Sequence, residues 1–564
     1  MIRRRGSARR AFLAVMAPAL VIGALAGPAG ASSSDPLIVS SLLPGSMAGC
    51  DPVASAVSPS VSQVLSLVLP RATTSSPSGT AVAAESVFVQ AEVTNLNPLV
   101  VDYQLRRGAA WSDGTRVGLA DFIATAGRGA AGNTASAPQY RLIRSIRQGS
   151  SRHHVVVTFR TPTSAWPSLF SPLMAASTSP STLTGCTSPS AAADISAGPF
   201  VIATSSADHV VLVRNPLWKG RTPAMQWIDA RTSGGGQVIV ASTSGPVVIE
   251  RTWMTGRTLA ALSSSAALSS QVDLSDQLLS LNFATTSGVT SSVMVRQALA
   301  HFIDRQAIVA SGPQALDPKV AVAGSNLVSQ GQPGYTGPPA RPLSTSPTST
   351  STPTTLQGAK PIGSALASQF LHRAGWTLQD GRWADRRGRS LSIRLLANGD
   401  DRWAVTAARA IVEQLTLSHV PTTLHLAPSA PAVAQGIRSG RADAGVFARP
   451  ADPYLAHAAA WFAVPASGPP STLWTGYRDR TVAGLATKAG AMLNPVNALP
   501  LYQQVGRRLW VMMPTLPLYT EPFVTAWSSH LDGVVDNPYV PGTLSAATTW
   551  TLSGATKAAS GQSR

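Results

Sequence analysis

The chain has 564 residues, 44% of them hydrophobic and 6% aromatic, which is enough for at least two packed cores. Its formal net charge is +18, but the arginines are dispersed singly or in pairs; this favours a solvated basic surface and argues against nucleic-acid binding. Two cysteines and nine scattered histidines lack metal-ligand spacing, so we predict no metal and no cofactor.

The N-terminus is organised like a secretory signal peptide. Five arginines between positions 3 and 10 precede an uncharged apolar run over 11–26, and Ala29-Gly30-Ala31 fits a cleavage site. The run is shorter than the roughly 20 residues that a spanning helix needs. We therefore expect 1–31 to be removed after export to the periplasm, the cell envelope or the medium, by the general or the twin-arginine route. An uncleaved membrane anchor is the alternative.

Short apolar runs and helical patterns follow in mixed order, which is typical of the α/β class. The 32–60, 125–138, 174–196 and 336–356 segments are rich in small and polar residues and are predicted to be loops, with a low-complexity insertion in the last. Predicted strands cover 99–105, 154–158, 209–214, 238–240, 247–249 and 391–396. Predicted helices cover 293–308, 365–374, 404–415 and 501–512.

One block has the chemistry of a strand, a tight turn and a helix start. Asp113-Gly114 can form the turn, Trp111 can fill the core beneath it, and Asp121 is placed to open a helix. The ordered run from Tyr103 to Phe122 resembles the signature of family 5 solute-binding proteins of ABC importers, the dipeptide, oligopeptide and nickel receptors. We interpret these residues as scaffold and not as ligand contacts.

Further blocks resemble the same family in the expected order, so that the resemblance covers about 35–551. They lie at 197–200, 212–218, 278–283, 295–308, 370–388 and 501–519. In the fourth block, helical geometry places Arg296 and Asp304 on one stripe, with Val295 and Leu299 facing inward. Asp304 is therefore predicted to be a cap or an ion-pair partner and not a catalytic acid.

The resemblance implies an α/β, two-lobed periplasmic-binding-protein-like fold, type II-like, with an additional subdomain in the first lobe and a hinge between the lobes. Lobe I would comprise 32–60, 187–278 and 512–551, and 61–186 would form the inserted subdomain. Lobe II would comprise 279–511, and 552–564 would be a flexible tail.

The resemblance also suggests a ligand-binding segment. Asp452 lies nine residues after Asp443, which resembles the spacing of the acid that binds the terminal amine in peptide receptors. The segment departs from the family because Ala448-Arg449 replaces Gly-Trp and Pro453 replaces an aromatic residue. The alternative is that Asp452 caps a helix beginning at Pro453. Arg449 is either an anion clamp or a surface residue.

Aromatic residues after this segment offer candidate walls for a binding cleft. Trp461, Trp474 and Tyr477 would suit a receptor for varied side chains, although core packing is the alternative. Cys50 and Cys186 are a candidate disulfide if the compartment is oxidising.

The sequence therefore predicts a monomeric binding protein that delivers di- or oligopeptides to the permease of an ABC importer. No catalytic residues are predicted, because the elbow, zinc and phosphate-loop motifs of common enzymes are missing. No nucleic-acid partner is expected. The alternatives are a receptor for a nickel chelate, haem or sugar on the same fold, and a degenerate envelope scaffold or sensor partner.

Overall fold

The structure is a computed structural model. It describes residues 38–43, 51–54, 57–76, 80–84, 86–132, 134–178, 195–206, 208–232, 246–251, 256–330, 332, 334–335, 364–450, 452–463, 475–535, 537 and 542–553. The expected signal peptide, both cysteines, Trp474, the strand predicted at 238–240 and the low-complexity insertion lie outside these residues. No helix within the described ranges combines the length and apolar character needed to cross a membrane.

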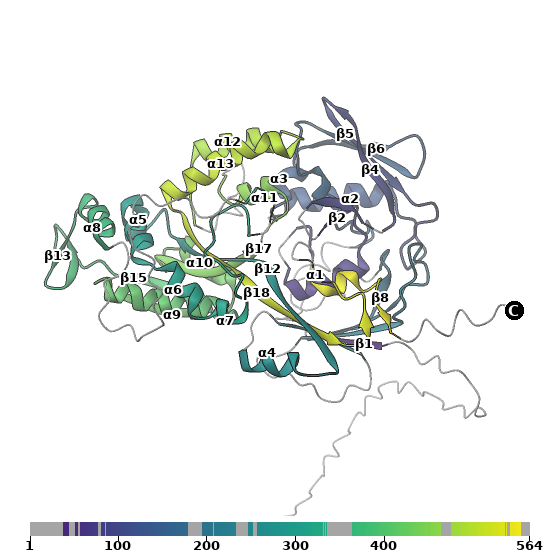
Figure 1. The fold of residues 1–564 in the computed structure, drawn as a ribbon. Helices are drawn as coiled ribbons and strands as arrows, with labels where there is room; N and C mark the ends of the chain where they lie inside the picture. Colours follow the sequence, from purple (N-terminus) through teal and green to yellow (C-terminus); the bar gives the residue numbers. More distant parts are fainter. Residues whose placement is uncertain are drawn as a thin grey trace, which may run out of the picture. The chain divides into compact units, whose positions relative to one another are not determined.

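A ten-stranded mixed sheet has the order β16-β15-β17-β12-β18-β11-β1-β10-β9-β8 (Figure 1). Its strands are β1 (Ile38–Leu43), β8 (Phe200–Ser205), β9 (His209–Arg214), β10 (Trp227–Thr232), β11 (Val247–Arg251), β12 (Leu268–Phe283), β15 (Ile393–Asn398), β16 (Thr422–Ala427), β17 (Ala444–Pro450) and β18 (Thr515–Ser528).

Smaller sheets and helices surround it. A four-stranded antiparallel sheet, β4-β5-β7-β6, contains β4 (Phe88–Leu96), β5 (Leu99–Leu105), β6 (Ile143–Gln148) and β7 (His154–Phe159). The two-stranded pairs are β2 (Thr73–Ser75) with β3 (Ala81–Ala83), β13 (Trp376–Gln379) with β14 (Arg382–Asp385), and β19 (Leu531–Asp532) with β20 (Thr551–Leu552). The helices are α1 (Pro59–Val68), α2 (Leu119–Ala131), α3 (Ala137–Tyr140), α4 (Gly256–Ser263), α5 (Val293–Phe302), α6 (Arg305–Ala310), α7 (Pro313–Leu316), α8 (Ser364–Arg373), α9 (Arg402–Leu417), α10 (Ala430–Arg438), α11 (Leu455–Ala460), α12 (Arg480–Gly490) and α13 (Pro495–Met512).

The described residues form two large hydrophobic cores, and the β12–β18 pair belongs mainly to the second. The first core takes residues between Leu43 and Val248 and between Leu531 and Trp550, and it includes both the β4–β7 sheet and α1. The second core takes residues between Ile249 and Ala526. Because each core draws on distant segments of the chain, several strands must pass between them. The domain boundaries given above remain a prediction.

The chain passes between the cores along β12 and β18, which are 16 and 14 residues long. They pair antiparallel in two stretches, Leu268–Leu274 with Pro522–Ser528 and Leu278–Asn282 with Thr515–Thr520. The register shifts between Leu274 and Leu278, so the ladder is interrupted near its middle. Such an irregularity re-aims a strand locally and is a natural place for bending.

Most predicted elements are confirmed, and the errors have local causes. The helix predicted over 293–308 is two helices, because Asp304 caps α6 by accepting a hydrogen bond from the Ala307 amide at 3.0 Å. This confirms the capping role predicted for Asp304. The loop predicted at 125–138 is wrong, since α2 continues to Ala131 and α3 follows. The loop predicted at 32–60 is also wrong in part, because it contains β1, which pairs with β10 on one side and β11 on the other.

The signature block forms the predicted turn. Gly114 has φ +86°, and the Trp111 indole is buried and donates to the Asp121 carboxylate at 3.3 Å. Asp121 is not the cap itself but the third residue of α2, where it accepts from the Gly118 amide at 2.8 Å. Its other oxygen accepts from the Ala176 amide, so one carboxylate joins the turn, the helix and a distant loop.

Arg296 was predicted to lie on the face of the helix opposite the inward-facing Val295 and Leu299. That prediction is wrong, because only 2% of Arg296 is exposed. Its guanidinium donates to the carbonyl oxygens of Met512 and Met513 at the C-terminal end of α13, and of Thr290 and Ser291 before α5. Carbonyls at a helix C-terminus lack internal donors and carry the negative end of the helix dipole. A buried cation therefore stabilises the junction of α5 with α13.

Three carboxylates lie where β12 and β18 are irregular. The Glu521 side chain is 3% exposed, and burial together with the carboxylates of Asp401 and Asp276 raises its pKa well above the usual range. Burial also raises the pKa of Asp276 to about 6. The folded protein therefore binds protons more tightly than the unfolded chain at these groups, and it loses that stability as pH rises through their folded pKa values.

We predict that Glu521→Gln stabilises the protein relative to the wild type at neutral pH. The neutral amide cannot ionise, so the difference in free energy of unfolding should grow from near zero at pH 4 to about 1–2 kcal/mol at pH 8. Urea unfolding at several pH values measures it. Glu413→Gln on the exposed face of α9 is the matched control, and an equal pH trend in both variants would contradict the buried-carboxylate account.

Candidate functional site

A cavity of about 260 Å³ lies where the first core meets α11. One wall comes from Arg71, β2 and the loops that carry Ser136 and Ser168, and the other comes from 452–457. Segments almost 400 residues apart in the chain therefore face one cavity, which contains both an arginine and an aspartate. Its other described lining residues are Thr134, Ala135, Ser171, Pro453, Tyr454 and His457.

Asp452 lies in this cavity and has two partners of its own. Its Oδ1 accepts from the Tyr454 amide at 2.8 Å, which fixes the turn before α11. Its Oδ2 is 2.8 Å from Nδ1 of His457. The predicted helix begins at Leu455 and not at Pro453, so Asp452 orders the turn before the helix. Its side chain remains 20% exposed, and each carboxylate oxygen can accept more than one hydrogen bond.

His457 connects Asp452 to the opposite wall. Its ring is buried, and Nε2 lies 3.1 Å from the Ser168 hydroxyl oxygen, a contact between residues 289 positions apart. Tyr454 and Thr73 line the same cavity from its two walls. Burial raises the pKa of Tyr454 to about 12, so this hydroxyl stays neutral and able to donate at physiological pH.

The series of contacts from Ser168 to His457 to Asp452 has the order found in a serine hydrolase triad. The surroundings of these residues do not support catalysis. The Ser168 hydroxyl donates to the Ala165 carbonyl at 2.7 Å. The amides of Ser168, Leu169 and Phe170 donate to Ala165, Trp166 and Tyr140 respectively, so none of them is available for an oxyanion. We interpret the three residues as a link between the walls of the cavity.

Arg449 is buried, so the predicted surface role is wrong. It lies on β17, 5% exposed, where its guanidinium donates to the Asn326 carbonyl and stacks over Phe462 at 5.7 Å. Burial lowers its pKa to about 10, although Asp452 opposes this shift. Arg449 therefore holds β17 against the 326 loop and lies behind the cavity wall.

The predicted aromatic residues lie outside the cavity lining. Tyr477 is 3% exposed, and its hydroxyl donates to Asp479 at 2.8 Å within a small core formed by α11, α12 and α13. Trp461 packs against the same core. The alternative prediction, core packing, fits both residues better than a cleft wall.

Sequence reasoning missed Arg71, Ser168 and His457. Arg71 could have been singled out from the sequence, because it is the only charged residue between Asp51 and Glu85 and follows an apolar helix. No sequence pattern points to Ser168 or His457, since their contact depends on how distant segments of the chain pack together. Asp452 was identified because it follows a family-like segment.

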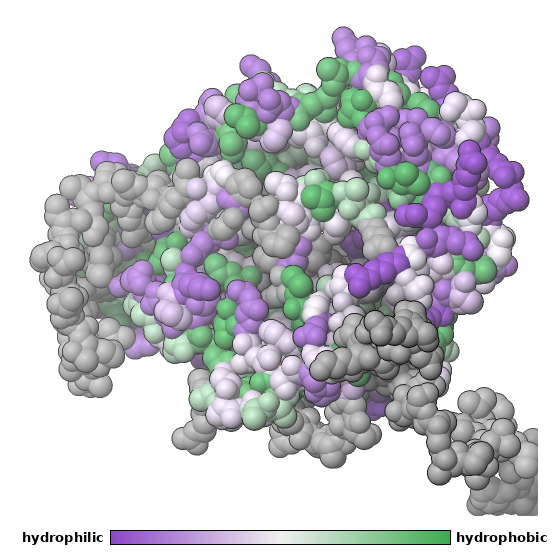
Figure 2. Space-filling model, turned by 45° about the vertical axis from the view of Figure 1, so that its right-hand side comes forward, coloured by the Kyte–Doolittle hydropathy of each residue, from purple (hydrophilic) through white to green (hydrophobic). Residues whose placement is uncertain are grey.

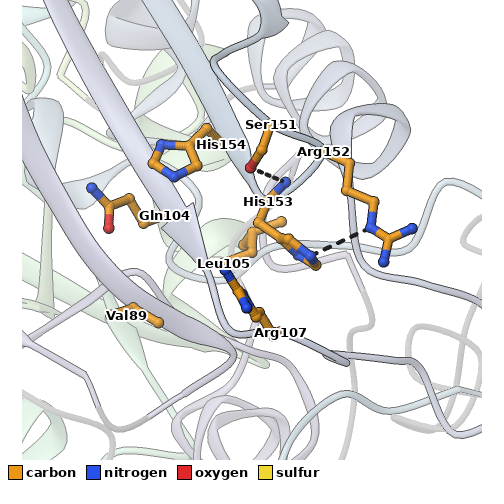
Figure 3. A pocket seen from close by; sticks show the side chains of 8 residues that line it. All are labelled: Val89, Gln104, Leu105, Arg107, Ser151, Arg152, His153 and His154. Carbon is orange, nitrogen blue, oxygen red and sulfur yellow. Dashed lines mark hydrogen bonds between the residues drawn. The ribbon is translucent and has the colours of Figure 1, made fainter.

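A second, larger hollow of about 520 Å³ lies on the β4–β7 sheet (Figure 3). Hydrophilic side chains also prevail at the upper right of the space-filling view (Figure 2). Partial burial and the charges of Arg152 and Arg107 lower the pKa of His153, and the ring of His154 points away from it toward Asp102 at 3.0 Å. All of its lining residues lie on the β4–β7 sheet or in the turns next to its strands, so a ligand here would not join the two cores.

Comparisons with known proteins bear on the family of the chain and on its fold. The family model "Bacterial extracellular solute-binding proteins, family 5 Middle" matches residues 83–467. Over 177 residues the chain is 30% identical to the oligopeptide-binding protein OppA of Mycobacterium bovis and of Mycobacterium tuberculosis. That alignment covers 30% of this chain and 30% of each relative, so the chain spans less than a third of the length of the curated relatives it matches.

Solved structures share the fold at low sequence identity. The periplasmic EDTA-binding protein EppA superposes with a TM-score of 0.76 at 19% identity, covering 92% of this chain and 96% of that one. An oligopeptide-binding protein from Thermus thermophilus gives 0.71 at 15% identity, with 92% and 96% covered. AppA from Bacillus subtilis gives 0.69 at 16% identity, with 92% and 98% covered.

The fold thus defines a two-lobed α/β binding protein of the periplasmic type. The chain belongs to the family 5 bacterial extracellular solute-binding proteins, which serve ABC importers and are not an enzyme family.

We predict that Ser168→Ala loosens the contact between the cavity walls without unfolding the protein. Loss of one hydrogen bond of about 1 kcal/mol should increase amide exchange in 452–460 roughly fivefold. Hydrogen-exchange mass spectrometry measures this. Ser264→Ala removes a local hydrogen bond on the exposed end of α4 and should leave the segment unchanged, whereas equal exchange in the wild type and Ser168→Ala would rule out the link.

Proposed function

We propose that this protein is exported and binds di- or oligopeptides between its two lobes for delivery to the permease of an ABC importer. The observation that carries the proposal is the position of Asp452. It is a partly exposed carboxylate in a cavity between the two walls, at the place where the family-like segment predicts an amine contact. A protonated amine can bind the free lone pairs of this carboxylate.

The contacts around Asp452 support such a role. Tyr454 and His457 hold the carboxylate in place before ligand arrives, which reduces the entropy lost on binding. Hydroxyl groups line the rest of the cavity and can bind peptide carbonyl and amide groups. Ligand that contacts both walls would favour the arrangement in which they approach, as hinge closure requires.

The cavity favours the short end of the peptide range. Its volume of about 260 Å³ is below the roughly 300–1,000 Å³ of sites for drug-sized molecules. Dipeptides therefore fit the proposal better than long peptides. Solved relatives are described as binding EDTA, a nickel–histidine complex or peptides, so a carboxylate-bearing chelate is the second candidate ligand.

We predict that Asp452→Asn weakens peptide binding by about ten- to hundredfold, because it removes a charge-assisted contact worth about 1.5–3 kcal/mol. Native mass spectrometry of the mature protein, followed by calorimetric titration with di- to pentapeptides, tests this. Asn retains the acceptor for the Tyr454 amide, so the turn should survive.

The matched control is Asp400→Asn, an exposed aspartate in the turn before α9 that should leave affinity unchanged. A wild-type protein silent toward all the peptides but binding metal chelates would replace the peptide proposal with the second candidate. A protein silent toward both classes would favour the envelope scaffold or sensor role.

A further inference from the structure

Loops at one end of the β4–β7 sheet bring four basic side chains together (Figure 3). Arg107 follows β5 and Arg152 lies between β6 and β7, and both line the hollow of about 520 Å³. Arg116 and Arg152 line a neighbouring hollow of about 250 Å³, which shares His153 with the first. We call Arg107, Arg116, Arg152 and His153 the basic cluster.

The backbone holds the loops of the basic cluster in place. The Leu105 amide donates to the His153 carbonyl at 2.7 Å, so the turn after β5 lies beside the turn before β7. Ala110 and Arg116 form a β-bridge, which fixes the third loop. The bases of the arginine side chains therefore have fixed positions before any partner binds, which reduces the entropy lost on binding.

The positive charge of the basic cluster is not balanced by neighbouring acids. No ion pair within the described ranges includes its three arginines, all of which are exposed, and no described acid lines either hollow. Asp102 on β5 is paired with His154 at 3.0 Å. Asp113, three residues before Arg116, accepts from the Thr115 amide at 2.9 Å. The arginines are thus available to an external anion.

The ring of His153 shows how close these charges lie. Partial burial, and then the charges of Arg152, Arg107 and Arg116, lower the pKa of His153. Its Nε2 accepts from Nε of Arg152 at 3.4 Å, as a neutral ring can. The charge of the basic cluster therefore lies on its guanidinium groups, which repel one another and are stabilised by a shared anionic partner.

Phosphate headgroups in a membrane match this surface. Guanidinium groups donate paired N–H groups to phosphate oxygens. Arginines spread over two neighbouring hollows can contact separate headgroups at once, whereas one small anion reaches only some of them. Val89, which is 57% exposed, lines the larger hollow. An apolar side chain beside arginines suits the boundary between headgroups and acyl chains.

We propose that the basic cluster docks the protein on the phosphate headgroups of an anionic membrane. This inference goes beyond peptide delivery and holds whichever ligand the cavity at Asp452 binds. Attraction to anionic lipids grows with each arginine near the surface and falls off within a Debye length, so it depends on salt. Docking of this kind keeps an exported receptor close to a permease in the same membrane.

Cosedimentation of the mature protein with lipid vesicles tests the inference. The vesicles contain phosphatidylcholine alone or an equal mixture with phosphatidylglycerol. The triple variant Arg107→Gln, Arg116→Gln, Arg152→Gln should bind the anionic vesicles about ten- to hundredfold more weakly than the wild type. The matched control, Arg382→Gln, Arg386→Gln, Arg387→Gln, removes the same charge from exposed positions on and beside the β13–β14 hairpin and should bind nearly as well as the wild type.

Equal losses in the two triple variants would overturn the inference, because overall charge and not the basic cluster would then decide binding. A wild type that binds both kinds of vesicle equally, or neither, also overturns it. If sodium phosphate raises Tm in the wild type but not in the cluster variant, and no vesicle binds, the site takes a soluble phosphate and membrane docking is wrong.

Calorimetric titration with dipeptides separates this inference from the proposed function. The cluster variant should bind dipeptides as the wild type does, since its substitutions lie outside the cavity that contains Asp452. Vesicle binding that depends on the basic cluster supports docking even where the wild type binds no dipeptide. Dipeptide binding without vesicle binding leaves the proposed function intact and overturns docking.

Discussion

The long antiparallel pair of β12 and β18 is the constraint on which the rest of the structure depends. The second core packs along this pair and the first core reaches it at Trp527, while the ladder of the pair is interrupted near Asp276. Motion of one core relative to the other must be absorbed by these strands and the few segments beside them. The buried carboxylates Glu521, Asp401 and Asp276 lie at the same place, and Asp452 raises the pKa of Asp276. The strand crossing and the ligand cavity are thus electrostatically connected.

Binding and closure follow from how the cavity is built. Asp452 is ordered by the turn before α11, and Arg71 by the backbone contacts after α1. Each residue is positioned by its own wall, while the Ser168–His457 contact is a modest link between the walls. One such contact holds the walls weakly, so a ligand that contacts both walls can shift the equilibrium between open and closed arrangements.

Sequence reasoning reached the class and much of the fold, but only part of the site. Strands such as β5, β7 and β9 follow from their apolar patterns, and Asp113-Gly114 specifies its own turn. Arg296 was placed wrongly, because two of its carbonyl partners, Met512 and Met513, lie more than 200 residues away in the chain. Ser168 and His457 were missed for the same reason, since a contact across 289 residues leaves no local pattern. Asp452 was found through a resemblance that spacing alone could not have supplied.

The central claim is that one ligand joins the two walls of the cavity that contains Asp452. Hydrogen-exchange mass spectrometry of the mature protein, with and without a saturating dipeptide that has free ends, tests it most directly. The account predicts added protection in both 71–75 and 452–460 at once, with the hollow around His153 unchanged. Protection confined to one wall, or centred on the β4–β7 sheet, would contradict it.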